Sequence, residues 1–264
     1  MTFRLADSRV IAGDAAEQRR LARSLLTVLQ PFGLLAFRCA DTHGHLELVE
    51  PEDRAREAAR RALVGLSGAL RLPVQFQRAH LEPIFDHWHL RNTLHYVFRQ
   101  DSRHGFGHDP HHDASNLPDL LGLRVIGTWT ARHVRRHLPR VDRAALLDHL
   151  GAPDLDERPL VLDRLADAAA AAVGVAGLDG RSAAVVEARR AAVHVARSQM
   201  QTAELAASLS CSAPTVRRLA ASTPDPRVVR AVEGQLRLRA GREDDAAFVL
   251  ARPGADRRPD SDDE

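Results

Sequence analysis

Lysine is absent from the sequence, so all 37 fixed side-chain cations of this 264-residue chain are arginines. Codon usage in a GC-rich genome is the simplest explanation for most of this bias. Arginine nevertheless differs from lysine in holding one phosphate through two parallel hydrogen bonds. Aromatic residues are also scarce, at 4%, and alanine supplies much of the 44% hydrophobic fraction. That composition favours helices over cores built on aromatic packing.

Long apolar runs and paired cysteines are absent as well. No stretch approaches the ~20 apolar residues that a membrane helix needs, and no basic segment followed by an apolar one opens the chain. The two cysteines, Cys39 and Cys211, are far apart and do not form a metal-type pair. These absences argue against a membrane partner, a disulfide framework and a zinc knuckle. We therefore expect a cytoplasmic protein.

The formal net charge of +2 conceals a segregation of charge along the chain. Residues 1–140 contain 20 arginines and 15 acidic residues, whereas residues 141–180 contain 3 arginines and 8 acidic residues. Residues 181–242 contain 11 arginines and 4 acidic residues, and residues 243–264 contain 3 and 8. Two basic blocks are thus separated by an acidic connector and followed by an acidic tail. This arrangement indicates a nucleic-acid partner.

Strand-like and helical patterns alternate over about the first 130 residues. Asp14 is placed to cap the first helix, and a proline followed by acidic residues opens the second. The β-α-β-β-α-β order predicts an α+β fold with a split βαβ arrangement, in which helices cover one face of an antiparallel sheet. The expected segments are a short strand and turn within 2–12, a helix at 14–33, strands at 34–40 and 43–50, a helix at 51–70, a strand at 72–77 and a further helix at about 87–101.

From residue 181 the pattern is helical throughout, and residues 202–222 predict a helix-turn-helix. Thr202 and Ser212 are placed as N-caps, and Pro214 lies where a first helical turn tolerates proline. A plain helical hairpin in a bundle is the alternative, and the basic charge of this block favours DNA. The residues expected in its core are Leu205, Leu209, Val216 and Leu219. The residues expected to face a DNA groove are Thr215, Arg217 and Arg218.

These patterns divide the chain into four parts. The first domain, predicted at 1–135, is followed by an acidic helical connector at 136–180. An all-α helix-turn-helix domain is predicted at 181–242. The acidic tail at 243–264 has nothing to bury and is expected to be disordered.

His43 and His45 form an H-x-H pattern on a predicted strand. Side chains two residues apart on a strand point the same way, so both imidazoles could bind one divalent ion. Such pairs arise easily by chance in a chain with 14 histidines. The pattern alone does not establish a metal site.

Tyr96 is the only tyrosine in the chain, and Gln100 lies one helical turn further on. Tyr96 could provide a phenolic nucleophile, and Gln100 a neutral oxygen ligand to an ion held by the two histidines. A phenol with a pKa near ~10 attacks poorly at neutral pH unless it is activated, and a metal ion polarising the target phosphate eases that attack. The alternative is that Tyr96 simply packs beside Leu94 and Val97.

In combination, these motifs resemble those of the single-tyrosine HUH transposases and, more closely, the REP-associated tyrosine transposases. In that family a strand H-x-H is followed some fifty residues later by a helix with Y-x-x-x-N or Y-x-x-x-Q. Here "HGHLELV" and "HLRNTLHYVFRQ" fill these two places. Some members also have a C-terminal helix-turn-helix that begins much like "VVEARRAAVHVAR". The resemblance spans roughly residues 3–222, and its specificity lies in the order and spacing of short motifs.

The resemblance implies a ferredoxin-like or RRM-like HUH catalytic domain at 1–135. It implies that His43, His45 and Gln100 hold Mg²⁺ or Mn²⁺ beside the scissile phosphate of single-stranded or hairpin DNA. Tyr96 would attack, giving a 5′-phosphotyrosine link and a free 3′-hydroxyl, and a second strand end could reverse the step during DNA transposition.

Duplex DNA is the expected partner of the helix-turn-helix, and the protein is expected to be a monomer or a homodimer. A domesticated, non-catalytic DNA-binding protein or transcriptional regulator is the alternative.

Three positions depart from the family pattern. Gly44 stands where the family has a bulky apolar residue, and we expect it to weaken the packing beneath the histidines. Thr42 replaces a common asparagine, and "QDS" at 100–102 replaces the usual asparagine and proline. None of these changes removes a ligand or the nucleophile, but they leave room for a relative that binds DNA without turnover.

Other histidines and arginines suggest further contacts. His87 and His89 also fit H-x-H, but at a helix start their side chains project ~200° apart and cannot easily share an ion. We therefore expect these histidines to make surface or substrate contacts and Trp88 to be packed. Arg78, Arg91, Arg99 and Arg103 are predicted to contact the DNA backbone without reading sequence. A solvated charged face is the alternative for each of them.

A histidine-rich loop follows the tyrosine helix. It could form a second metal site or a pH-sensitive clamp on DNA, or be an ordinary solvated loop. Its candidate residues are His104, His108, Asp109, His111, His112 and Asp113.

Overall fold

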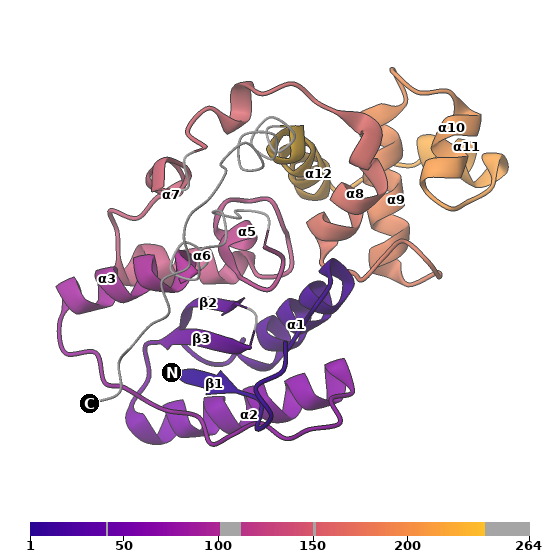
Figure 1. Ribbon diagram of the computed structural model, residues 1–264. Coiled ribbons are helices and arrows are strands. Elements are labelled where there is room, and N and C mark those ends of the chain that lie inside the picture. The colour runs from indigo at the N-terminus through magenta and orange to yellow at the C-terminus, as the bar shows by residue number, and fades with distance from the viewer. Residues whose placement is uncertain (41, 101–111, 150–151, 241–264) are drawn as a thin grey trace, which may run out of the picture.

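The computed structural model describes residues 1–40, 42–100, 112–149 and 152–240. The fold is mixed α+β and mostly helical, with a small three-stranded antiparallel sheet near the N-terminus (Figure 1). Within the described ranges, no helix is both long enough and apolar enough to cross a membrane.

The sheet has the order β1-β3-β2, with β3 in the centre. Its strands are β1 (Thr2–Arg4), β2 (Leu34–Ala40) and β3 (His43–Leu48). β3 pairs antiparallel with both neighbours, and His45 lies opposite Thr2 of β1 and Arg38 of β2. Because side chains alternate along a strand, His43 and His45 share one face of β3, and Gly44 and Leu46 share the other.

Helices cover both faces of this sheet. The helices of the predicted split βαβ arrangement are α1 (Ala15–Val28) and α2 (Glu52–Leu70), and they pack with Phe3, Phe37 and Leu46 in one core. The opposite face is covered by α3 (His87–Phe98) and by α6 (Thr128–His137), which both contact β2. In Figure 1 these two pairs of helices lie on opposite sides of the strands.

Aspartate side chains cap the starts of α1 and α3. The predicted cap is confirmed for α1, where the Asp14 side chain accepts a hydrogen bond of 2.8 Å from the Glu17 backbone. Asp86 caps α3 in the same way by accepting from the His89 backbone at 2.7 Å. Both contacts satisfy a backbone donor that a helix start otherwise leaves without a partner.

The prediction of a regular fourth strand at 72–77 is wrong. This part of the chain makes only isolated antiparallel bridges: Phe76 pairs with Leu5, just after β1, and His80, beyond the predicted strand, pairs with Thr2 of β1. Pro73 has no backbone N–H to give to a ladder, and β1 itself spans only three residues. The chain still runs along β1, but it does not form a continuous strand there.

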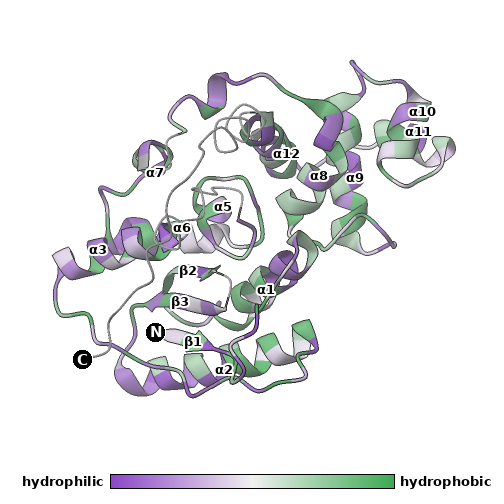
Figure 2. Cartoon of the chain, in the orientation of Figure 1, coloured by the Kyte–Doolittle hydropathy of each residue, from purple (hydrophilic) through white to green (hydrophobic). Residues whose placement is uncertain are grey.

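The residues predicted as an acidic connector at 136–180 contribute to two separate cores. Val141, Leu146 and Leu155 pack with α3 and the sheet. Further along, α8 (Leu165–Val173) packs with α9 (Ala183–Ala196) and α12 (Pro226–Ala240). Figure 2 shows the apolar α8 beside these two helices. The remaining short helices of the region are α5 (Leu117–Leu120), α7 (Arg143–His149), η1 (Leu155–Glu157) and η2 (Leu162–Arg164).

Arginine networks join α1 to the C-terminal helices. Arg19 is buried and pairs with Asp113 at 2.7 Å and also with Asp167 on α8. Arg239 on α12 pairs with the same Asp167 at 2.9 Å. Arg23 donates to the Val173 carbonyl at 2.6 Å. The two basic parts of the chain are therefore tied together by ion pairs and hydrogen bonds as well as by apolar contacts.

Candidate functional site

His43 and His45 lie side by side on the face of β3 that α3 covers. Their ring centroids are 5.0 Å apart and the rings are nearly perpendicular, at 84°. The Nδ1 atom of His45 lies 3.2 Å from the Thr2 hydroxyl on β1, and this contact orients the imidazole. A hydrogen bond to one ring nitrogen is the usual way in which a protein fixes a histidine that acts as a metal ligand.

Tyr96 meets His45 from α3. The two ring centroids are 5.4 Å apart, with the rings at 87°. Leu94 and Val97 are buried on the anchoring side of α3, whereas Tyr96 is 39% exposed. Tyr96 therefore does not lie among the core residues of its helix, and its ring completes a series of contacts from His43 through His45.

Gln100 lies one turn beyond Tyr96 and is buried, at 1% exposure. Its side-chain nitrogen donates to the Tyr96 carbonyl oxygen at 3.4 Å. No group of three His, Cys, Asp or Glu side chains suited to a metal ion occurs among the described residues. A metal held by the predicted set would therefore depend on the Gln100 amide oxygen in addition to the two imidazoles.

The packing beneath the histidines is complete, contrary to the expectation for Gly44. The ring of Phe3, on the neighbouring strand, occupies the space where a side chain at position 44 would lie. A Cβ atom built on Gly44 would be only 2.2 Å from Phe3 Cζ. Phe3 itself is buried in the core with α1 and α2. Here the aromatic ring of β1 does the packing that a bulky central residue would otherwise do.

A cavity of about 1050 Å³ opens beside these residues. It is lined by both sheet and helix residues, so a substrate in it would meet Tyr96 and His45 together. The polar and aromatic part of the lining includes Thr2, His45, Phe85, His87, His89, Asn92, Tyr96 and His137. Its charged residues are Glu47, Glu50, Glu52, Arg56, Glu82 and Asp86.

Glu47 is a buried carboxyl group in the wall of this cavity, two residues beyond His45. Burial raises its pKa to about 8, an effect that the charge of the Met1 amino group partly opposes. Neither side-chain oxygen has a hydrogen-bond partner in the described part of the chain. The sequence analysis missed this residue, although its position two after His45 on a strand was the available signal.

Two of the four predicted backbone-contacting arginines belong to α3: Arg91 lies within it and Arg99 is its C-cap. Arg78, Arg91 and Arg99 are exposed, and Arg103 is outside the described residues. Arg91 and Arg99 flank His95, whose pKa is lowered first by burial and then by these two charges. Their exposure leaves them accessible to a phosphate backbone.

Two further predictions have clear structural outcomes. Trp88 is not packed as expected but is 67% exposed, because it lies on the solvent side of the first turn of α3. Asp113 is buried in its ion pair with Arg19 and so is not a ligand in a solvated loop. His112 is half-buried, and the other loop candidates, His104, His108, Asp109 and His111, lie outside the described residues.

The predicted helix-turn-helix is formed by α10 (Thr202–Ser208) and α11 (Ala213–Ala220), which pack on each other and, through α11, on α9. The predicted Ser212 cap is confirmed, but Thr202 is not a cap. Gln201 precedes α10 instead, and its backbone N–H donates to Glu204 at 2.7 Å. The four predicted core residues, Leu205, Leu209, Val216 and Leu219, are all buried.

The turn between these helices is held from α9. Ser210 has a left-handed backbone with φ 49°, and Arg189 donates to the carbonyl oxygens of Leu209 and Ser210, both at 3.1 Å. Arg217 and Arg218 on α11 are exposed, whereas Thr215 is half-buried and its hydroxyl lies 3.0 Å from that of Ser212. α11 therefore presents two arginines on a helix whose start and turn are well fixed.

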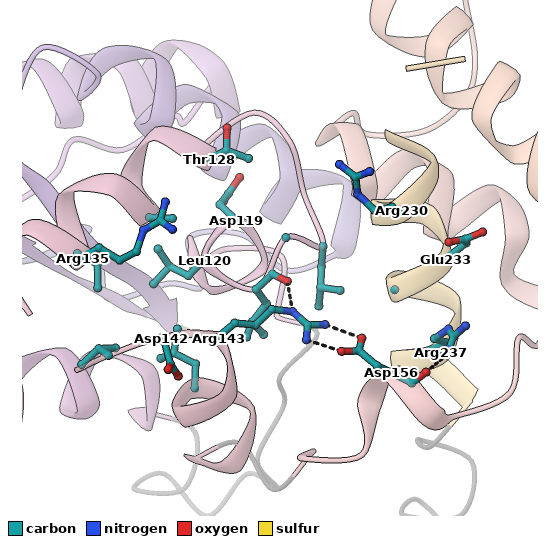
Figure 3. Close-up of a pocket in the computed structure, with 18 residues that line it drawn as sticks. Asp119, Leu120, Thr128, Arg135, Asp142, Arg143, Asp156, Arg230, Glu233 and Arg237 are labelled. Atoms are coloured by element: carbon teal, nitrogen blue, oxygen red, sulfur yellow. Dashed lines mark hydrogen bonds and ion pairs between the residues drawn. The ribbon is translucent and has the colours of Figure 1, made fainter. Parts of the chain in front are cut away.

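A second cavity, of about 790 Å³, lies between α12 and the segment from α5 to α7 (Figure 3). Arg143 spans one side and pairs with Asp156 through both terminal nitrogens, at 2.6 and 2.7 Å. Its described lining contains no histidine, cysteine or tyrosine. The cavity beside Tyr96 is thus the better candidate for a catalytic site.

Comparison with family models, with curated proteins and with solved structures gives no significant match for this chain. A function for this chain is therefore inferred from its own residues and their geometry.

Proposed function

We propose that this protein is a divalent-metal-dependent endonuclease that cleaves and rejoins single-stranded or hairpin DNA through Tyr96, as a REP-associated tyrosine transposase does. One observation carries the proposal: the rings of His43, His45 and Tyr96 contact one another in series, and the last two line a large cavity. The two histidines come from the sheet and the tyrosine from a helix, so the contact is a product of the fold.

The arrangement of the chain supports the catalytic domain that the resemblance implies. The segment at 75–80 runs antiparallel to β1, which places it next to the β1-β3-β2 sheet in the order of a split βαβ or ferredoxin-like fold. The helices α1 and α2 form the two crossovers of that arrangement. The H-x-H then lies on the central strand, where α3 can bring a nucleophile to it.

The divalent ion of this proposal is Mg²⁺ or Mn²⁺, as the resemblance implies. His43, His45 and the amide oxygen of Gln100 would hold the ion, and the contact between His45 and Thr2 fixes the orientation of one ligand. When bound, the ion would polarise the scissile phosphate as a Lewis acid. Three protein ligands leave coordination positions open for oxygen atoms of the substrate.

The contribution of the chain itself is to position the nucleophile and the strand. The Tyr96 oxygen forms a bond to phosphorus while the bond from phosphorus to the 3′-oxygen breaks. The phenol loses its proton to water, and the 3′-oxygen gains one to become a hydroxyl. The 5′-phosphotyrosine link conserves the bond energy, so a 3′-hydroxyl can later attack it and release Tyr96.

The helix-turn-helix supplies a second DNA contact in this proposal. In Figure 1, α10 and α11 lie at the opposite end of the molecule from α3. Arg217 and Arg218 would contact duplex DNA there, while single-stranded DNA occupies the cavity at Tyr96. The same feature favours the second candidate function, a non-catalytic DNA-binding protein or regulator.

Incubation with a 3′-labelled single-stranded hairpin oligonucleotide and Mg²⁺ or Mn²⁺ separates these functions, because the fragment on the 3′ side of the cleaved bond is the one that stays linked to Tyr96. We expect a covalent protein–DNA adduct that survives denaturing electrophoresis, is lost with EDTA and is absent from Tyr96→Phe. The Tyr96→Phe variant keeps the aromatic ring and so should keep its fold and its affinity for duplex DNA. Duplex binding without any adduct from the native protein would favour the regulator.

A further inference from the structure

Phe85 and Trp88 are unusually exposed for large apolar side chains. They are 81% and 67% exposed, in a chain with only eight phenylalanines, two tryptophans and one tyrosine. Together with Tyr96 they account for all the exposed large aromatic side chains found among the described residues. Three exposed aromatics within twelve residues of sequence call for a reason other than core packing.

Helical spacing places Trp88 in line with the proposed nucleophile. Trp88, Asn92 and Tyr96 are spaced four residues apart on α3 and so form one row along the helix. Asn92 and Tyr96 line the cavity, and Trp88 continues the row past its edge. At a rise of 1.5 Å per residue, Trp88 lies about 12 Å along the helix from Tyr96. That length corresponds to a short run of nucleotides in an extended strand.

Phe85 directly precedes Asp86, the cap of α3. Its ring and that of His89 have centroids 6.1 Å apart and are tilted by only 31°. Both residues line the cavity, as does Tyr96. The rings of His45 and Tyr96 and those of Phe85 and His89 therefore line one cavity.

The exposed residues around these aromatics are polar or charged, and they include the acidic Glu82 and Asp86 next to Phe85. His87, Arg91 and Asn92 are exposed neighbours of Trp88 on α3, and Arg78 is exposed on the preceding segment. A protein–protein interface has a core depleted of charged residues, whereas Phe85 and Trp88 lie among exposed charged side chains such as Asp86 and Arg91. Aromatic side chains interleaved with arginines are instead the pattern of a single-stranded nucleic-acid platform, where bases stack and cations follow the backbone.

We propose that Phe85 and Trp88 stack unpaired bases of the DNA strand whose phosphate lies at Tyr96, and that they thereby select single-stranded over duplex DNA at this site. The inference rests on the proposed function, since it concerns the bases of the DNA strand that Tyr96 would cleave. Base pairs in a duplex keep their faces stacked inside the helix and cannot use these rings.

Binding measurements in EDTA test this inference without cleavage. The full-length protein, Phe85→Ala and Trp88→Ala would each be titrated against a labelled single-stranded oligonucleotide and against its duplex form. Each alanine variant should lose about tenfold in single-strand affinity. Trp88→Phe should retain most of the affinity, and duplex affinity should not change. Val64→Ala, which removes an apolar side chain 65% exposed on α2, is the matched control.

Three results would overturn the inference. The first is that both alanine variants bind single-stranded DNA as tightly as the native protein does. The second is that they lose affinity for single-stranded and duplex DNA equally. The third is a change in oligomeric mass by light scattering with no change in DNA affinity, which would make this surface an interface between copies of the chain. A native protein that forms no adduct with metal, but whose alanine variants lose single-strand affinity, would refute the proposed cleavage and not the stacking.

Discussion

Gly44 illustrates how a residue can be misjudged when its partner lies elsewhere in the chain. A glycine between two histidines predicts a gap, yet the gap is filled by the ring of Phe3. The filling residue lies on β1, and only the antiparallel register that sets Phe3 opposite Gly44 brings the two together. The shared orientation of His43 and His45 could be predicted because side-chain alternation along a strand is local. The identity of the residue opposite Gly44 on the neighbouring strand could not be predicted in this way.

This packing predicts that Gly44→Ala is destabilising. A methyl group at position 44 must displace the Phe3 ring, which is held in a core, and overpacking of this kind costs about 2 kcal/mol. Urea denaturation would measure the free energy of unfolding. Gly68→Ala is the control, because Gly68 faces open space on α2 and an alanine there should stabilise the helix by about 0.5–1 kcal/mol. Equal effects of the two substitutions would contradict the packing described for Phe3.

At the scale of elements, local signals were sufficient for helices and insufficient for pairing and docking. Asp14 and Ser212 were identified as caps because a cap bonds within its own first turn. The segment at 72–77 has strand composition, but it does not form a continuous ladder of hydrogen bonds. Its neighbour β1 is too short, and Pro73 has no backbone N–H to donate. The alanine-rich α8 is almost wholly buried, and a helix that is apolar all round is usually enclosed by other helices. The acidic residues near it in the sequence led instead to the prediction of a connector.

The separation of α11 from α3 predicts that the two DNA contacts can be altered independently. Arg217→Ala and Arg218→Ala should each lower affinity for duplex DNA and reduce the slope of log affinity against log salt by about 1. Adduct formation on a short single strand should be unaffected. Arg60→Ala, an equal loss of charge on the exposed face of α2, should change the duplex salt slope much less. Equal salt slopes for all three variants would remove α11 from the DNA interface.

At the scale of the whole molecule, Asp167 on α8 connects helices from both ends of the chain. It pairs with Arg19 of α1 and with Arg239 of α12. Burial alone would raise the pKa of Asp167, but the charges of Arg239 and Arg19 together hold it below its ordinary value. This lowered pKa means that the ionised carboxylate stabilises the folded state. The sequence could not predict the network, because its members are separated by more than seventy residues.

Asp167→Asn should therefore destabilise the protein at neutral pH, by about 1–2 kcal/mol after allowance for solvent screening of a half-exposed carboxylate. Because the folded pKa is lowered, this difference is fully present above the unfolded pKa of about 4 and disappears as pH falls through the lower folded value. Urea denaturation at pH 7 and pH 3 would measure it. Asp163→Asn, in an exposed and weak ion pair of 3.9 Å, should have little effect at either pH. A difference that grew in acid would contradict the assigned role of Asp167.

The most direct test of the account is to locate the covalent link to DNA. Because Tyr96 is the only tyrosine in the chain, any phosphotyrosyl link to the protein must be at this residue. After reaction with a single-stranded hairpin and Mg²⁺ or Mn²⁺, digestion with nuclease and trypsin should leave the peptide 92–99 carrying a 5′-nucleotide, detected by mass spectrometry. The peptide should be unmodified in EDTA and in His45→Ala. An unmodified peptide 92–99 under conditions in which the native protein binds the hairpin, or an adduct mapped to any other residue, would contradict the central claim.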